Sequence, residues 1–152
     1  MTSMSDRLRS DLTVSLKARD ELRSSTLRMM LSALSYAEVA GKERHQLGDD
    51  EVIAVLSTEA KKRREAAAAY ADGNRPELAA KEVAEGEIIA EYLPAQLTDE
   101  EVRALVAGTI AELGVADEGQ RAMGRVMGAL TPRTRGRADG AAVAAEVRRQ
   151  LG

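Results

Sequence analysis

Five arginines lie in a stretch of the chain that contains no acidic residue, between Gln120 and Ala138. A guanidinium group binds phosphate oxygens through parallel hydrogen bonds, and contact with a nucleic-acid backbone requires basic side chains without neighbouring acids. Composition alone leaves a second interpretation equally open, because a run of charged residues is usually a solvated surface. The candidate RNA-binding residues are Arg121, Arg125, Arg133, Arg135 and Arg137.

The scarcity of aromatic residues restricts the kind of nucleic acid that these arginines can bind. Aromatic residues make up 2% of the chain, and there is no Phe or Trp. Proteins that bind runs of unpaired bases stack them on aromatic side chains. We therefore expect a folded or duplex nucleic acid, recognised through its backbone.

No arrangement typical of a catalytic or metal site accompanies the arginines. The chain has no cysteine, and its single histidine, His45, lies in a polar segment that predicts a surface loop. Acidic residues cluster at 49–51 and 99–101, where they suit the first turn of a helix better than acid–base chemistry. No glycine-rich phosphate cradle of the dinucleotide-binding or Walker type occurs. We expect no catalytic residue, no metal and no cofactor.

The overall composition predicts a folded protein. Of the 152 residues, 44% are hydrophobic and 31% are charged, which excludes general disorder. A core without Phe or Trp must be built from Leu, Val, Ile, Met and Ala. No apolar run is long enough to span a membrane, and residues 1–12 lack the apolar centre of a signal peptide. We expect a cytoplasmic protein with no membrane partner.

The elements that position the arginines are all predicted to be helices. In the first part of the chain, apolar residues recur at helical spacing from Leu27 to Leu34, and Asp49 is expected to cap a third helix. The segment 59–69 consists of charged residues and then alanines, which predicts a helix with little to bury. A turn at 72–76 should return the chain as a fourth helix, so that the third and fourth helices form an antiparallel hairpin. In this hairpin we expect Lys61 or Arg64 to lie near Glu82 or Glu85.

Pro94 marks the division of the chain. It cannot donate a backbone hydrogen bond and disfavours helical geometry at Leu93, so the preceding helix must end or kink there. Thr98 can cap the next helix, and Glu101 stands three residues later to complete a capping box. The expected domains are an N-terminal helical domain at 1–93 and a small C-terminal domain at 98–152, joined by a packed hinge at 94–97.

Three short helices are expected after the hinge. Val102–Leu113 is the cleanest amphipathic pattern, and Gly114 should end it. The next helix is expected to stop at Pro132, which places 133–137 in a loop where arginines can converge. Asp139 should cap the last helix. No segment alternates with a period of two, so the whole chain is predicted to be all-α, with a long N-terminal hairpin and a C-terminal three-helix domain.

Several motifs of this chain occur together in one known family. In the C-terminal part they are Met123-Gly124-Arg125-Val126-Met127-Gly128-Ala129-Leu130, Pro132 and Gly136-Arg137-Ala138-Asp139-Gly140. In the earlier part they are Ser25-Thr26-Leu27-Arg28-Met29, the charged run from Glu59 to Glu65 and Tyr92-Leu93-Pro94. Together they closely resemble the GatB/YqeY family over nearly the whole chain. The family also uses Lys at basic tail positions, where this chain has Arg133 and Arg135.

The resemblance implies an all-helical protein related to the tail of the B subunit of the glutamine-dependent aminoacyl-tRNA amidotransferase. In that enzyme the tail helps to hold the tRNA, whereas the chemistry lies in other domains and in the amidase subunit. The resemblance thus implies tRNA as a partner and the family-level label of carbon–nitrogen ligase with glutamine as amido-N-donor. Nothing in the chain matches the kinase-like cradle or the serine–lysine machinery of that enzyme, so the label describes an association.

Three functions therefore remain open from the sequence. The first is an RNA-binding accessory module that contacts tRNA through the basic tail. The second is a helical protein-interaction module with no RNA role, which docks a protein partner through the N-terminal hairpin. The net charge of −3 favours the second, whereas the acid-free stretch and the family resemblance favour the first. A third is an assistant of a ligase complex that does not touch tRNA.

Overall fold

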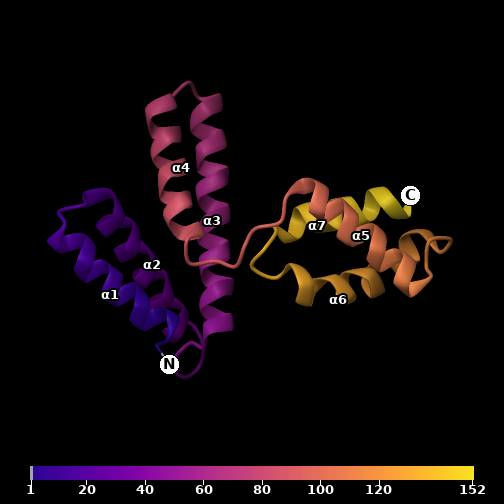
Figure 1. Cartoon of the computed structure of the whole chain (residues 1–152), viewed down its shortest axis with the longest axis horizontal. Coiled ribbons are helices and arrows are strands. Elements are labelled where there is room, and N and C mark those ends of the chain that lie inside the picture. Colours follow the sequence, from indigo (N-terminus) through magenta and orange to yellow (C-terminus); the bar gives the residue numbers. More distant parts are fainter. Residues whose placement is uncertain (1) are drawn as a thin grey trace. The chain divides into compact units, whose positions relative to one another are not determined.

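The computed structural model describes residues 2–152, and within that range it contains helices and no strand. The helices form two compact units, of which one ends at Leu93 and the other begins at Pro94 (Figure 1). Each unit has its own apolar core. The prediction of an all-α protein is confirmed.

The N-terminal unit contains four helices. These are α1 (Met4–Lys17), α2 (Glu21–Val39), α3 (Asp49–Asp72) and α4 (Pro76–Ala90). Helices α1 and α2 lie side by side, and α3 and α4 form the antiparallel hairpin that the turn signals predict (Figure 1). The fully buried side chains at the centre of this unit are Leu8, Leu27, Met30, Val52, Leu56 and Ile89.

The helix starts follow from local capping. Asp20 caps α2 by accepting a hydrogen bond from the Arg23 backbone N–H at 3.0 Å, and Pro76 occupies the first turn of α4. The expected cap of α3 is wrong by one residue: Gly48 is the N-cap, and Asp49 is the first helical residue. Asp49 instead accepts a hydrogen bond from the Met4 backbone N–H at 3.1 Å, which joins the starts of α1 and α3.

The charged part of the hairpin is more buried than its composition predicts. The Arg63 guanidinium lies within 3.2 Å of Glu85 Oε2, 3.7 Å of Glu82 Oε2 and 3.6 Å of Glu59 Oε2. All four side chains are between 13% and 18% exposed, so water is largely excluded from this cluster. The expectation named Lys61 or Arg64 for this contact, but Arg63 is the side chain that lies among the three acids. The helical periodicity of the sequence does not identify Arg63, because the segment is charged on every side and no apolar residues indicate which face is buried.

Beyond this cluster the hairpin is exposed, as predicted. No residue between positions 61 and 87 is fully buried, whereas Ala60 and Ile88, which flank that range, are. The tip consists mainly of alanines and charged residues, which form helix readily and bury little area.

The C-terminal end of α4 is fixed to α1 through Tyr92. Its side chain is 6% exposed, and its hydroxyl donates a hydrogen bond of 2.5 Å to Asp11 Oδ2. Arg7 lies over the tyrosine ring, 4.6 Å from the centroid. Burial and the hydrogen bond to Asp11 raise the pKa of the Tyr92 hydroxyl, so it stays protonated as a donor.

The C-terminal unit contains three helices and a short 3-10 turn. These are α5 (Asp99–Leu113), η1 (Gly119–Ala122), α6 (Met123–Thr134) and α7 (Gly140–Leu151). The capping box is present, since Thr98 Oγ1 accepts from Glu101 N and Glu101 Oε1 accepts from Thr98 N, each at 3.1 Å. Gly114 ends α5 in the left-handed conformation, with φ of 66°, and Asp139 caps α7. The core side chains are Val106, Ile110, Val115, Val126, Leu130, Val143, Val147 and Leu151.

The segment 94–97 is bonded to the connection between α6 and α7. Gln96 Nε2 donates to Gly136 O at 2.7 Å, and Leu97 N donates to Arg137 O at 2.8 Å. Gly136 has a φ of 74°, so it takes a conformation that favours glycine at this turn. These bonds place two of the candidate arginines, Arg135 and Arg137, in an ordered turn.

Candidate functional site

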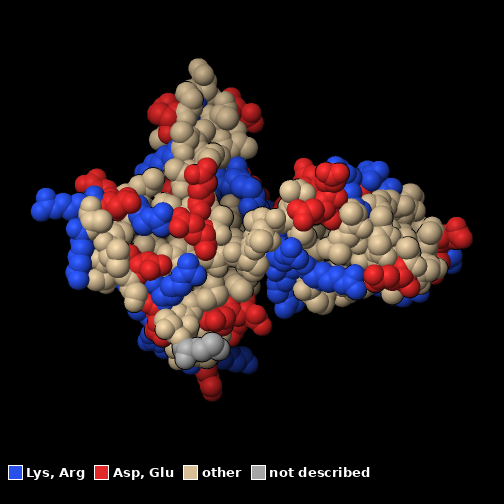
Figure 2. All heavy atoms as spheres, in the orientation of Figure 1, with Lys and Arg blue, Asp and Glu red and all other residues tan. Residues whose placement is uncertain are grey.

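The five candidate arginines lie on three kinds of structure. Arg121 is in η1, Arg125 and Arg133 are in α6, Arg135 is the C-cap of α6, and Arg137 is in the connection to α7. Arg137 is half-buried and the other four are exposed. Figure 2 shows basic side chains gathered over the α6–α7 connection.

The expectation that Arg133 lies in a loop after Pro132 is wrong. Helix α6 continues through Pro132 to Thr134, so Arg133 is in its last turn. Proline removes one backbone donor, but the turn still closes, because Arg135 N donates to Thr131 O at 3.0 Å. Thr134 is also buried, and its hydroxyl donates to Leu130 O at 3.2 Å.

Acidic residues outside the stretch contact two of its arginines. Arg125 forms an ion pair with Glu118, and Arg133 Nη2 lies 3.2 Å from Glu112 Oε2. The acid-free sequence therefore does not mean that all five arginines lack ion pairs. Both pairs are exposed, however, and exposed pairs contribute only about 0–1 kcal/mol, so they exchange readily for other anions.

The arginines divide into two groups along α6. Arg121 and Arg125 both contact Glu118, through its carbonyl oxygen and its carboxylate respectively. Arg133 stands eight residues after Arg125, which is about 12 Å along the helix axis. Arg133 and Arg137 lie together, because both line one groove. The Arg135 side chain makes no hydrogen bond or ion pair with any residue that the structure describes.

The groove lies between α5 and the end of α6. Its volume is about 670 Å³, within the usual range of ligand sites of about 300–1,000 Å³. The charged residues in its wall are Arg133, Arg137 and Glu101, and the remaining lining residues are Leu97, Ala104, Leu105 and Pro132.

Arg137 is held in the groove by its own backbone and side-chain bonds. Its Nε donates to Ala95 O at 3.1 Å, and its carbonyl oxygen accepts from Leu97 N. Within residues 2–152 no acceptor bonds its two Nη groups, which leaves them for an external anion. Arg133 is oriented differently, since Nη1 donates to Thr109 Oγ1 at 3.4 Å and Nη2 pairs with Glu112.

Glu101 is the one acid in this groove. The hydrogen bond from the Thr98 backbone N–H lowers the pKa of the Glu101 carboxyl, and the charge of Arg137 lowers it further. Glu101 is therefore ionised at neutral pH. The sequence identified Glu101 as a capping residue, but no signal in the sequence places it beside Arg137, because that contact joins elements far apart in the chain.

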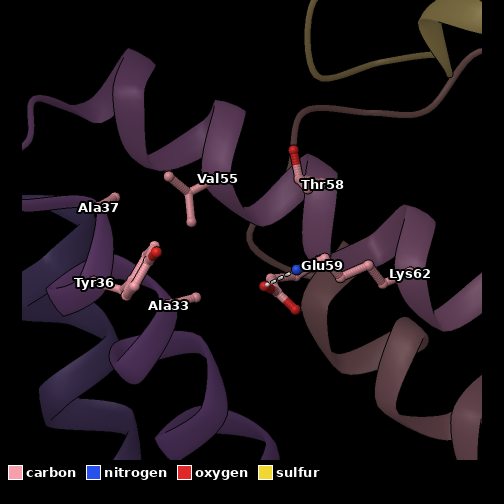
Figure 3. Close-up of a pocket in the computed structure, with 7 residues that line it drawn as sticks. All are labelled: Ala33, Tyr36, Ala37, Val55, Thr58, Glu59 and Lys62. Carbon is pink, nitrogen blue, oxygen red and sulfur yellow. Dashed lines mark hydrogen bonds and ion pairs between the residues drawn. The ribbon is translucent and has the colours of Figure 1, made fainter. Parts of the chain in front are cut away.

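A second, smaller hollow of about 350 Å³ lies between α2 and α3 in the N-terminal unit. Figure 3 shows Ala33 and Tyr36 of α2 on one side and Val55 and Glu59 of α3 on the other. The Tyr36 side chain is 76% exposed, which is unusual for a residue that carries so much apolar area. Its charged residues, Glu59 and Lys62, form an ion pair at 3.4 Å.

Residues 2–152 contain neither a cluster of metal-ligating side chains nor a helix that could span a membrane. Among residues 2–152 there is no group of three or more His, Cys, Asp or Glu side chains arranged to hold a metal ion. In the same range no helix has both the length and the apolar character needed to cross a bilayer.

Comparison with known proteins identifies the family. No curated protein matches the chain. A family model described as Yqey-like protein matches residues 5–151, which is nearly the whole sequence. That range covers nearly all of both compact units and includes all five candidate arginines. The chain therefore belongs to the YqeY-like protein family.

Proposed function

We propose that the C-terminal unit binds structured RNA, with tRNA as the target, through Arg121, Arg125, Arg133, Arg135 and Arg137. The observation that carries the proposal is the arrangement at the end of α6. The Arg135 side chain is exposed and makes no hydrogen bond or ion pair with a described residue, and Arg137 has both Nη groups free beside it. Such donors on an ordered turn suit phosphate oxygens, which position an RNA without reading its sequence.

The ion pairs of Arg125 and Arg133 do not oppose this role. Glu118 and Glu112 are 38% and 62% exposed, so each can return to water when a phosphate takes its place. The exchange replaces a weak surface pair with a charge-assisted contact and releases counterions from the RNA.

Family membership supports the choice of tRNA, because YqeY-like proteins resemble the tail of an amidotransferase that handles tRNA. On this proposal the chain serves carbon–nitrogen ligase chemistry with glutamine as amido-N-donor by holding the tRNA, while another protein carries the reacting groups.

Binding of a tRNA transcript, measured by fluorescence anisotropy at several salt concentrations, tests the proposal. Each neutralised phosphate should lower log affinity by ~0.7–0.9 per unit of log salt, so three to five contacts give a slope of about −2 to −5. Replacing Arg133, Arg135 and Arg137 by Ala should remove about two units of that slope. Circular dichroism should show the same helix content, since none of the three belongs to the core.

A matched control changes the net charge equally at other positions of the same unit. Replacing Arg103, Arg148 and Arg149 by Ala removes three positive charges from α5 and α7. If both triple variants lose the same affinity, the effect is one of net charge and the proposed site is wrong. If the wild type does not bind tRNA at low salt, the RNA function itself is wrong.

A protein-docking function is the second candidate, and the exposed Tyr36 favours it. Tyrosine is enriched at the centres of protein interfaces, and here it borders a hollow lined by Ala33, Ala37 and Val55. Tyr36→Ala should then abolish capture of a protein partner from lysate while leaving the tRNA affinity unchanged. If the Tyr36→Ala variant still captures the partner, the surface around Tyr36 is not the docking site.

A further inference from the structure

The groove beside Arg137 contains more apolar surface than phosphate contact requires. Leu97, Ala104, Leu105 and Pro132 line it together with two arginines and one acid. A phosphate group needs only the guanidinium nitrogens, so the aliphatic floor and Glu101 remain unused by backbone binding. A ligand that matches the whole groove has an anionic part, an apolar part and a hydrogen-bond donor.

We propose that this groove holds one unpaired guanine nucleotide of the bound RNA, with its phosphate on Arg137 and its base against Glu101. The proposal rests on the RNA-binding function and names the part of the RNA that the groove recognises. Arg133 is paired with Glu112, so Arg137 supplies the positive charge that complements the single negative charge of one phosphodiester.

The choice of guanine follows from the chemistry of a carboxylate. An ionised carboxylate only accepts hydrogen bonds, and it does so best from two donors that lie side by side. The Watson–Crick edge of guanine offers N1–H and the N2 amino group as neighbours. Adenine and cytosine place a ring-nitrogen acceptor beside their amino group, and uracil flanks its N3–H with two carbonyl oxygens. Those acceptors would face the Glu101 charge.

The position of Glu101 allows this contact. Its Oε1 accepts from Thr98 N at 3.1 Å, which fixes the side chain in the wall of the groove. The nearby charge of Arg137 helps to keep the carboxylate ionised.

The aliphatic floor replaces the aromatic platform that this unit lacks. Leu105 and Pro132 offer flat apolar contact to one base, and a guanidinium plane offers another stacking surface. The scarcity of aromatic residues excludes a platform for a run of unpaired bases, but a single nucleotide from the loop of a folded RNA does not need one. The groove volume of about 670 Å³ is sufficient for a ligand of that size.

The test uses the full chain labelled with ¹⁵N and titrated with each of the four nucleoside 5′-monophosphates. GMP should perturb the amide signals of Leu97, Ala104 and Leu105, and its affinity should exceed that of UMP, AMP and CMP at least ~5-fold. Inorganic phosphate should perturb signals near Arg137 without those of Ala104. Equal affinity for all four nucleotides would overturn the proposal.

Two variants separate base recognition from folding. Glu101→Gln keeps the capping box, because Gln also serves at that position, and it replaces one acceptor by a donor. It should abolish the preference for GMP while leaving phosphate binding the same or stronger, since it removes a negative charge. A preference that survives Glu101→Gln would refute the role of Glu101.

The second variant fills the groove. Ala104→Leu places a larger side chain on the groove wall at an exposed helical position, and Ala107→Leu makes the same change on α5 outside the lining. Ala104→Leu should weaken GMP binding and Ala107→Leu should not. If an acidic peptide perturbs the same amides at lower concentration than GMP, the groove is a protein site and the inference is wrong. Salt-dependent tRNA binding would survive that result, whereas loss of salt-dependent binding in the wild type would remove the function on which this inference rests.

Discussion

Replacing Tyr92 by Phe isolates one hydrogen bond that holds the N-terminal unit together. The change keeps the ring, which is 6% exposed and packs beneath Arg7, and removes only the hydroxyl that donates to Asp11. A hydrogen bond to a charged group contributes about 1.5–3 kcal/mol, and the lower end applies because Asp11 is 38% exposed and can bind water instead. We expect Tyr92→Phe to lower the free energy of unfolding by about 1.5 kcal/mol.

The same bond should depend on pH in a defined direction. Burial and the bond to Asp11 raise the pKa of Tyr92, so at high pH the unfolded chain loses its proton before the folded chain does. The stabilisation is therefore complete below the ordinary tyrosine pKa of about 10 and declines above it. At pH 11 the linkage for one group reaches at most about 1.4 kcal/mol, and solvent near Asp11 reduces this to about 1 kcal/mol.

Urea denaturation followed by circular dichroism at pH 7 and pH 11 measures both effects. Tyr36→Phe is the control, because that side chain is 76% exposed and its change should stay within about 0.5 kcal/mol. The reasoning fails if the two variants are equally stable at pH 7. It also fails if the difference between wild type and Tyr92→Phe is the same at both pH values.

Three further predictions concern other parts of the chain. Limited proteolysis should cut first at 93–99, where the first compact unit ends and the second begins, and early cuts within α5 would contradict that division. Arg63→Ala leaves three largely buried carboxylates without their guanidinium and should cost about 3 kcal/mol in thermal or urea unfolding, whereas Arg64→Ala should change stability by less than about 0.5 kcal/mol. Gly114→Ala should lower the melting temperature, because φ is 66° there and an L side chain costs about 1 kcal/mol. Gly108→Ala should raise the melting temperature, because Ala favours helix over Gly by about 1 kcal/mol and an added Cβ inside α5 would meet no atom within 4 Å.

The helices were predictable because their signals are local. Each capping or terminating residue acts within one turn of the helix that it begins or ends, so its effect can be recognised from the neighbouring sequence. These residues are Thr98 with Glu101, Pro76, Gly114 and Asp139. The largest error at a helix terminus, the predicted stop of α6 at Pro132, also has a physical cause. The last turn of α6 closes because contacts around the buried Thr134 outweigh the donor that proline lacks, and burial depends on the tertiary structure.

The sequence predicts which arginines belong to the candidate site, but it does not predict how they are arranged or which residues they contact. An acid-free run of arginines is visible in the sequence, but its partners Glu112 and Glu118 lie outside the run and meet it through the packing of the unit. Likewise Arg137 meets Ala95 across 42 positions of sequence, so no short window reveals the groove. Arg63 shows the same limit, since a segment charged on every side does not indicate which residue points inward.

Arg135 and Arg137 lie on either side of Gly136, and their side chains differ in how much conformational entropy they would lose on binding a ligand. The Arg137 side chain is held by its hydrogen bond to Ala95 O, whereas the Arg135 side chain has no hydrogen bond or ion pair among residues 2–152. Ordering a free side chain of this kind costs about 0.5–1.5 kcal/mol on association, and an ordered one avoids that cost. If this turn binds an anion as proposed, Arg135 should mainly raise the association rate through its charge, and Arg137 should mainly lower the dissociation rate. Two arginines in one turn would then act on different steps of binding.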